Sequence, residues 1–148
     1  MIDFRSLKHM PTIKLAMTTF PWSIDVDAPA EEAWATMLEH HIRHLPVTED
    51  DALMGIVTER ELRLFLRPGV APGDYKVRQV CAEDAYVVGD DTPLDVVVRE
   101  MAERQIGSAL VQRKGKLVGI LTTTDVCRVL AELLESRFPV DDDEPMPA

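Results

Sequence analysis

Two short segments combine hydroxyl and carboxyl side chains at a spacing that suits the first turn of a helix. They are Thr58-Glu59-Arg60-Glu61 and Thr122-Thr123-Thr124-Asp125, and each follows an apolar stretch that contains a glycine. A helix N-terminus offers N–H groups and positive potential to an anion such as phosphate, and a threonine hydroxyl adds a donor. An aspartate one turn along can accept two hydrogen bonds from a vicinal diol such as ribose. Both junctions are therefore candidate contacts for a phosphate and a sugar.

The same spacing has a second interpretation that involves no ligand. Thr-x-x-Glu is the capping-box pattern, in which the threonine caps the helix and the acid reaches back to the backbone. Acids in a first turn also interact favourably with the helix dipole. Asp125 is shorter than glutamate and less typical of a capping box, so the ligand-binding interpretation is stronger at Asp125 than at Glu61. The sequence leaves both interpretations open.

Arg43 and His44 stand at the start of the apolar segment 45–47. They can meet a phosphate if this segment faces one of the junctions; otherwise they form a solvated strand end. His40 and His41 lie nearby, but no carboxylate or cysteine has a matching ligand spacing, so we expect no metal site. The sequence also lacks a nucleophile elbow, a P-loop and a G-x-G-x-x-G motif. We therefore expect no enzymatic activity.

An internal repeat indicates which elements position these residues. Gly55-Ile56-Val57-Thr58 matches Gly119-Ile120-Leu121-Thr122, so positions 55 and 119 define an offset of 64 residues. The same offset pairs Pro29 with Pro93, and no gap is needed over residues 24–66. A repeat of this length indicates one supersecondary unit that cannot bury its apolar face alone. Two copies can bury those faces against each other.

Each copy has the pattern of a β-α-β-β-α unit. A β-rich segment precedes an Asp-x-Pro helix start, an amphipathic helix follows, and two short apolar strands then surround a polar turn before a last helix. We expect an α/β fold of two such repeats. The predicted organisation is an N-terminal arm (1–14) that leans on the second copy, a first repeat (15–66), a Pro/Gly-rich linker (67–77), a second repeat (78–134) and an acidic, disordered tail (135–148).

Composition restricts the partners and the compartment. The formal net charge of −10 makes the chain a poor candidate for binding nucleic acid, which needs a basic face. No apolar run approaches the length of a membrane span, and the N-terminus does not resemble a signal peptide. Two widely spaced cysteines offer neither a disulfide framework nor a metal motif. We expect a cytoplasmic protein with reduced thiols.

The repeated unit, the segment Arg43-His44-Leu45-Pro46-Val47 and the two Gly-containing junctions together resemble tandem CBS domains, also called a Bateman module. The likeness covers about residues 11–134. It implies a pseudo-twofold CBS pair in a stand-alone CBS domain-containing protein, with two clefts between the repeats. Such modules typically bind adenosine-containing ligands such as AMP, ADP, ATP or S-adenosylmethionine. The resemblance also implies that the acid of each junction holds the ribose and that the threonine approaches the phosphate.

Transferred residue by residue, the resemblance implies a better and a poorer site. The better site would consist of Thr18, Ser23, Arg43, His44, Leu45, Ile120, Thr122 and Asp125. The poorer site would consist of Ile56, Thr58, Glu61, Ala82, Val87, Ser108 and Ala109. Glu61 departs from the Asp/Asn of the family pattern, and Gly107-Ser108 replaces the Arg-His pair. The two clefts are therefore expected to differ.

The predicted function is that of a regulatory module that senses an adenine nucleotide or S-adenosylmethionine as a regulatory ligand, without a catalytic cofactor. A homodimer is expected from the resemblance, and the output would pass through a protein target that the sequence does not identify. The alternative is a structural or protein-interaction CBS module with no bound nucleotide.

Overall fold

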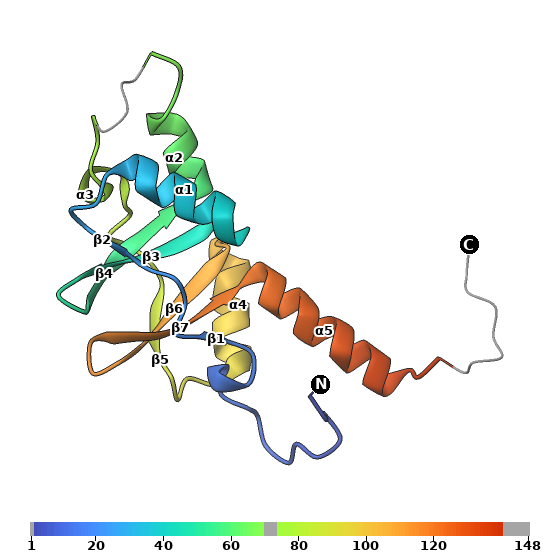
Figure 1. The fold of residues 1–148 in the computed structure, drawn as a ribbon. Coiled ribbons are helices and arrows are strands. Elements are labelled where there is room, and N and C mark those ends of the chain that lie inside the picture. Colours follow the sequence, from blue (N-terminus) through green and yellow to red (C-terminus); the bar gives the residue numbers. More distant parts are fainter. Residues whose placement is uncertain (1, 70–73, 141–148) are drawn as a thin grey trace.

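The computed structural model describes residues 2–69 and 74–140, which form two β-α-β-β-α units in one seven-stranded sheet (Figure 1). The first half of the chain contains η1 (Ile13–Leu15), β1 (Thr18–Thr19), β2 (Ile24–Asp25), α1 (Ala30–His40), β3 (His44–Glu49), β4 (Ala52–Thr58) and α2 (Glu59–Phe65). The second half contains α3 (Val77–Val80), β5 (Val87–Gly89), α4 (Leu94–Arg104), β6 (Ser108–Arg113), β7 (Lys116–Thr122) and α5 (Thr123–Arg137). The predicted α/β fold of paired repeats is confirmed.

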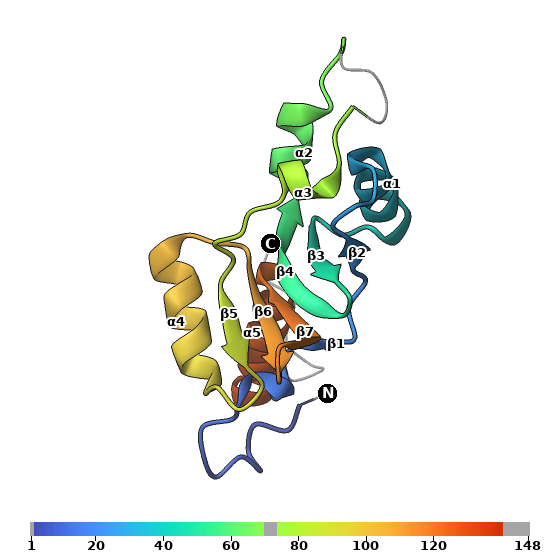
Figure 2. The same ribbon diagram turned by 90° about the vertical axis from the view of Figure 1, so that its left-hand side faces the viewer.

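The strands run in the order β2-β3-β4-β7-β6-β5, with β1 paired to β7. Within each unit the first strand is parallel to the second, and the second and third form an antiparallel hairpin. Helices α1, α2 and α3 lie with the first unit, and α4 and α5 with the second (Figure 2). The core accordingly has two clusters under the helices and a third, of Ile56, Leu110 and Ile120, between the units.

Backbone contacts between the units obey the offset of 64 residues. Ile56 is bridged to Ala82, and Ile120 is paired with Thr18 in the equivalent place. In these two contacts the roles of the two copies are exchanged, as expected for units related by a pseudo-twofold axis.

Each unit is completed by the segment that precedes the other unit in the chain. Ile13 is fully buried with Leu94 and Val97 in the second core, and its N–H donates to the Thr92 carbonyl. In the same way Val77 is fully buried in the first core. The expectation that the N-terminal arm leans on the second copy is met, and the arm supplies core residues there. Helix α3 falls partly in the segment predicted as a linker, and α5 extends three residues beyond the predicted end of the second repeat at 134.

The acidic end of the predicted tail, residues 141–148, lies outside the described residues, as do residues 70–73 of the predicted linker. Helix α5 projects away from the sheet (Figure 1), and Asp125 is its only buried described residue. This residue belongs to the candidate site.

The two junction glycines lie where the chain crosses a strand closely. A Cβ on Gly55 would stand 2.4 Å from the carbonyl oxygen of Ala82, and one on Gly119 would stand 2.6 Å from the Sδ of Met17. These contacts come from residues 77–82 and 13–18, which we call the exchanged segments because each packs on the other unit. The close crossing of these segments, and not a left-handed backbone conformation, favours glycine at both positions. The crossing also brings Thr18 and Ala82 beside the junctions.

Helices α1 and α4 end in the same way. Their C-cap residues, His41 and Gln105, both have a φ of 54° in the left-handed region. The chain then turns directly into β3 or β6. This turn places Arg43-His44 of one unit and Gly107-Ser108 of the other at the start of the hairpins, near the pseudo-twofold axis.

Candidate functional site

A cavity of about 680 Å³ opens between the two units at the N-terminus of α5. We call it the first cleft. Six of the eight residues predicted for the better site line it: Thr18, Arg43, His44, Ile120, Thr122 and Asp125. Sequence reasoning did not assign to this site the other residues that line the cleft, which are Pro21, Trp22, His41, Ile42, Thr123, Thr124 and Arg128.

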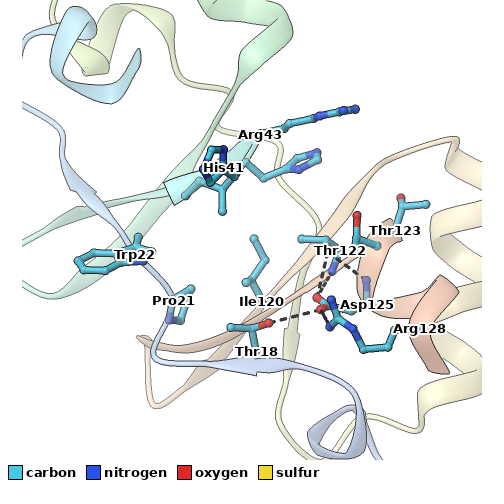
Figure 3. A pocket seen from close by; sticks show the side chains of 13 residues that line it. Thr18, Pro21, Trp22, His41, Arg43, Ile120, Thr122, Thr123, Asp125 and Arg128 are labelled. Carbon is cyan, nitrogen blue, oxygen red and sulfur yellow. Dashed lines mark hydrogen bonds and ion pairs between the residues drawn. The ribbon is translucent and has the colours of Figure 1, made fainter. Parts of the chain in front are cut away.

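Asp125 is the most strongly held side chain of the first cleft. It is 7% exposed. Its Oδ2 accepts hydrogen bonds from the Thr122 N–H at 2.9 Å and the Thr122 hydroxyl at 3.0 Å. Its Oδ1 accepts longer bonds from the Thr18 hydroxyl at 3.4 Å and from Arg128 at 3.3 Å. Figure 3 shows these groups converging on the carboxylate, with Trp22 and Pro21 across the pocket.

The capping-box interpretation is correct for both junctions. Thr122 with Asp125, and Thr58 with Glu61, each exchange the two hydrogen bonds of that motif. At α5, the N–H groups of Thr122, Thr123 and Asp125 already have protein partners. The helix end therefore offers an anion mainly its dipole, and direct contacts to a phosphate fall to side chains. Binding of a diol by Asp125 is still compatible with the cap, because Oδ1 has only the two longer bonds.

Two residues predicted for the better site lie elsewhere. Leu45 is fully buried in the core of the first unit, because neighbouring residues of a strand face opposite sides and His44 faces the cleft. Ser23 lines a separate cavity of about 240 Å³. The equivalent residues of the other unit behave alike, since Ala109 is fully buried in the second core and Val87 packs in the cluster between the units.

A second cavity, of about 390 Å³, lies at the N-terminus of α2. We call it the second cleft. Five of the seven residues predicted for the poorer site line it: Ile56, Thr58, Glu61, Ala82 and Ser108. The matching hairpin entry, Gly107-Ser108, carries no cation, as predicted, but the cleft receives basic side chains from other elements. Arg43, His44, Arg60 and Arg104 line it, because the axis brings the first unit's strand start to both clefts and α4 contributes an arginine.

An aromatic ring and a basic side chain occupy equivalent places beside the two clefts. Trp22 is stacked on His40 with ring centroids 3.8 Å apart, and the guanidinium of Arg104 lies 5.1 Å from the centre of the Tyr86 ring. Trp22 faces the first cleft and Tyr86 the second. The offset of 64 residues pairs Trp22 with Tyr86 and His40 with Arg104. Aligning the two copies of the sequence could therefore have identified these equivalent positions.

His44 lies at the boundary between the clefts. Burial lowers the pKa of its imidazole below the ordinary value of 6.5, and the neighbouring Arg43 lowers it further. A Cβ on Gly107 would stand 2.7 Å from the Nε2 of His44. The imidazole thus lies against Gly107, in the space that a side chain at this position would take.

No group of three or more His, Cys, Asp or Glu residues suited to a metal ion occurs within 2–69 and 74–140. In the same part of the chain, no helix has the length and apolar character to cross a membrane. Cys81 and Cys127 are free thiols.

Two α/β repeats around a pseudo-twofold axis, with a cleft beside the first turn of each last helix, define a paired-repeat module. The family comparison agrees with this architecture: the CBS domain matches twice, at residues 13–67 and 77–132. The chain belongs to the CBS domain family, as a tandem pair.

Relatives contain the pair in different contexts. An inosine-5'-monophosphate dehydrogenase of Thermoplasma acidophilum is 32% identical over 119 residues, which are 80% of this chain and 22% of that enzyme. The chain therefore spans about a fifth of that relative. A CBS domain-containing protein of Dictyostelium discoideum is 25% identical over 139 residues, covering 86% of this chain and 96% of the relative.

Solved structures share the fold. A structure described as a putative acetoin utilization protein of Vibrio cholerae has a TM-score of 0.80 and 25% identity, covering 90% of this chain and 99% of that one. The CBS domain pair of MJ0100, in complex with 5-methylthioadenosine and S-adenosyl-L-methionine, has a TM-score of 0.76 and 21% identity over 84% of this chain and 99% of that chain. CBSX2 in complex with AMP has a TM-score of 0.72 and 23% identity over 82% and 97% of the chains.

Proposed function

We propose that this chain is a regulatory module that binds an adenosine-containing nucleotide in the first cleft. The observation that supports this most is Asp125, a nearly buried carboxylate with a pair of long, exchangeable hydrogen bonds on Oδ1, at the end of a cavity between the repeats. A ribose diol can replace the Thr18 and Arg128 bonds without disturbing the cap made through Oδ2. Relatives of the same fold have been solved with AMP or with S-adenosyl-L-methionine.

The rest of the cleft complements a nucleotide. Ile120, Ile42 and Pro21 provide an apolar surface for a base. Arg43 and Arg128 provide mobile cations for a phosphate, since their side chains are exposed. A carboxylate for the sugar, an apolar wall for the base and guanidinium groups for the phosphate together match the three parts of AMP, ADP or ATP.

A second candidate function follows from the capping boxes. Because both junction acids are already bonded within the protein, the pair can also be a structural or protein-interaction module with empty clefts. The two functions make opposite predictions for ligand titration.

Calorimetric titration of the purified chain with AMP, ADP, ATP and S-adenosylmethionine tests the proposal. We expect at least one of them to bind with a dissociation constant below about 1 mM, equivalent to roughly −4 kcal/mol. No binding below that concentration for any of the four would refute the proposal and favour the interaction module. Mass spectrometry of small molecules released from freshly purified protein gives independent evidence on which compound occupies the cleft.

The proposal also includes a non-catalytic role, a homodimer and an output through a protein target, all of which rest on the family resemblance. Light scattering coupled to size-exclusion chromatography tests the dimer, for which the measured mass should be twice the 16.6 kDa of one chain. The cytoplasmic location stays a prediction.

A further inference from the structure

The two clefts share a pair of residues. Of the residues that the structure describes, Arg43 and His44 alone line both cavities. Every other described lining residue belongs to one cleft or the other. The clefts therefore meet at the first two residues of one hairpin, on the pseudo-twofold axis.

The packing of His44 against the second unit explains why Arg43 and His44 line both clefts. The axis brings Arg43-His44 of the first unit against Gly107-Ser108 of the second. A Cβ at position 107 would lie 2.7 Å from Nε2 and 3.0 Å from Cε1 of His44, so the imidazole occupies the space next to Gly107 that a side chain there would take. One unit supplies the large basic pair and the other supplies the small residues that accommodate it.

The Arg43 guanidinium is held weakly enough to bind a phosphate in either cleft. Its side chain is 81% exposed, and its Nε lies 3.8 Å from the Oε2 of Glu59, an ion pair too long and too exposed to hold it strongly. Glu59 also pairs with Arg63 at 2.7 Å. One guanidinium can make its paired hydrogen bonds to one phosphate at a time.

We propose that the two clefts are negatively coupled through Arg43 and His44, so that a phosphate-bearing ligand in one cleft weakens the binding of a second such ligand in the other. The inference rests on the proposed function, which it extends from one cleft to both. Two effects act in the same direction. The second ligand loses the shared cation, and its phosphate is repelled by the phosphate of the first, since both are drawn to the same pair of residues. Salt screens this repulsion over a Debye length of roughly 10 Å at 0.1 M.

The coupling has a predictable size and charge dependence. Coupling between binding sites commonly amounts to about 5–150-fold in affinity, and we expect about tenfold for ATP. The effect should be smaller for AMP, which has less charge, and absent for adenosine. By reciprocity each cleft weakens the other by the same factor.

Each cleft can be observed separately, because the chain has two tryptophans and one of them, Trp22, lines the first cleft. Trp34→Phe leaves Trp22 as the reporter of the first cleft. In the variant with Trp22→Phe and Trp34→Phe, Tyr86→Trp places a reporter at the equivalent position of the second cleft. ATP is then titrated against the fluorescence of each protein.

The decisive measurement disables one cleft and observes the other. Asp125→Asn empties the first cleft at moderate ATP concentration, and we expect the second cleft to bind ATP about tenfold more tightly as a result. Measured against Arg43→Gln alone, the gain from adding Asp125→Asn should be smaller, because only the repulsion between the two phosphates then remains. Arg63→Gln is the matched control, because Arg63 pairs with the same Glu59 but lines neither cleft.

The outcomes separate the two proposals. A gain from Asp125→Asn at the second cleft that is smaller in the Arg43→Gln background and unchanged in the Arg63→Gln background supports the coupling. Unchanged or weaker binding at the second cleft, or an equal gain with adenosine, would overturn the coupling while leaving nucleotide binding in place. Absence of ATP binding at both reporters would overturn the coupling, and absence of binding by all four compounds in the calorimetric titration would overturn the proposed function as well.

Discussion

Replacement of Asp125 by asparagine separates the two roles of this carboxylate. In the protein, Oδ2 closes the capping box of α5 with Thr122, and Oδ1 accepts hydrogen bonds from Thr18 and Arg128, two other residues that line the cleft. An asparagine can keep its amide oxygen toward Thr122 and so preserve both acceptor bonds. It then presents an NH₂ group in place of Oδ1, and the negative charge is lost. The cap survives while the diol acceptor does not.

The expected magnitudes differ accordingly. Loss of a charge-assisted hydrogen bond amounts to about 1.5–3 kcal/mol, so nucleotide affinity should fall by roughly 10- to 150-fold. The free energy of unfolding should fall by no more than about 1 kcal/mol, because the neutral bonds to Thr122 are kept. Glu61→Gln is the matched change at the second junction and should not weaken binding in the first cleft.

Calorimetry with the best-binding nucleotide gives the affinities, and urea unfolding of the same proteins gives the stabilities. An affinity for Asp125→Asn equal to that of the parent would remove Asp125 from the site. A loss of several kcal/mol in unfolding free energy would instead show that the residue is mainly structural. Either result would contradict the division of roles between Oδ1 and Oδ2.

Three further predictions concern the fold. Gly55→Ala should lower the free energy of unfolding by about 3 kcal/mol and Gly119→Ala by about 1 kcal/mol. The added methyl meets the Ala82 backbone oxygen at position 55 but a flexible side chain at position 119. Equal losses in urea titrations would contradict this reasoning. Ile13→Ala, at a fully buried position, should reduce the unfolding free energy by about 2–5 kcal/mol, and a change within about 0.5 kcal/mol, as at a surface site, would show that the N-terminal segment is not part of the core. Because the pKa of His44 is lowered in the folded chain, the unfolded chain takes up this proton first as the pH falls, so stability is unaffected above about pH 6.5 and decreases below it. His44→Gln should therefore lose less stability than the parent between about pH 7.5 and pH 5.5, and equal losses would argue against a neutral, buried imidazole.

Much of the site could be predicted by transferring a family pattern onto the sequence, and the misplaced residues have a common physical reason. Leu45 and Ala109 are neighbours in sequence of residues that do line the clefts. In an extended strand, however, successive side chains point to opposite faces. These two residues therefore lie in the cores beneath the helices. A family pattern that marks a short segment does not by itself distinguish the two faces.

The exchanged segments were not predicted as core elements for a different reason. The 3₁₀ turn Ile13–Leu15 and the helix Val77–Val80 are too short to show a helical period. Their buried residues, Ile13 in the first segment and Val77 and Val80 in the second, are recognisable as core only once each segment packs on the unit that it does not directly precede. From the sequence the two segments were therefore predicted as the end of the arm and as the boundary between the linker and the second repeat.

By itself the sequence determined the repeat, its β-α-β-β-α order and the two junctions, because periodicity, turn residues and caps are local signals that occur once in each copy and so twice in the chain. Only the tertiary structure decided that the Thr-x-x-acid junctions close as capping boxes, that Arg128 joins the first cleft, and that Arg60 and Arg104 join the second. It also decided that Arg43 and His44 belong to both clefts at once. Comparison of the two copies assigns each residue to one copy and so to one cleft. Residues that lie near the pseudo-twofold axis, however, can line both clefts.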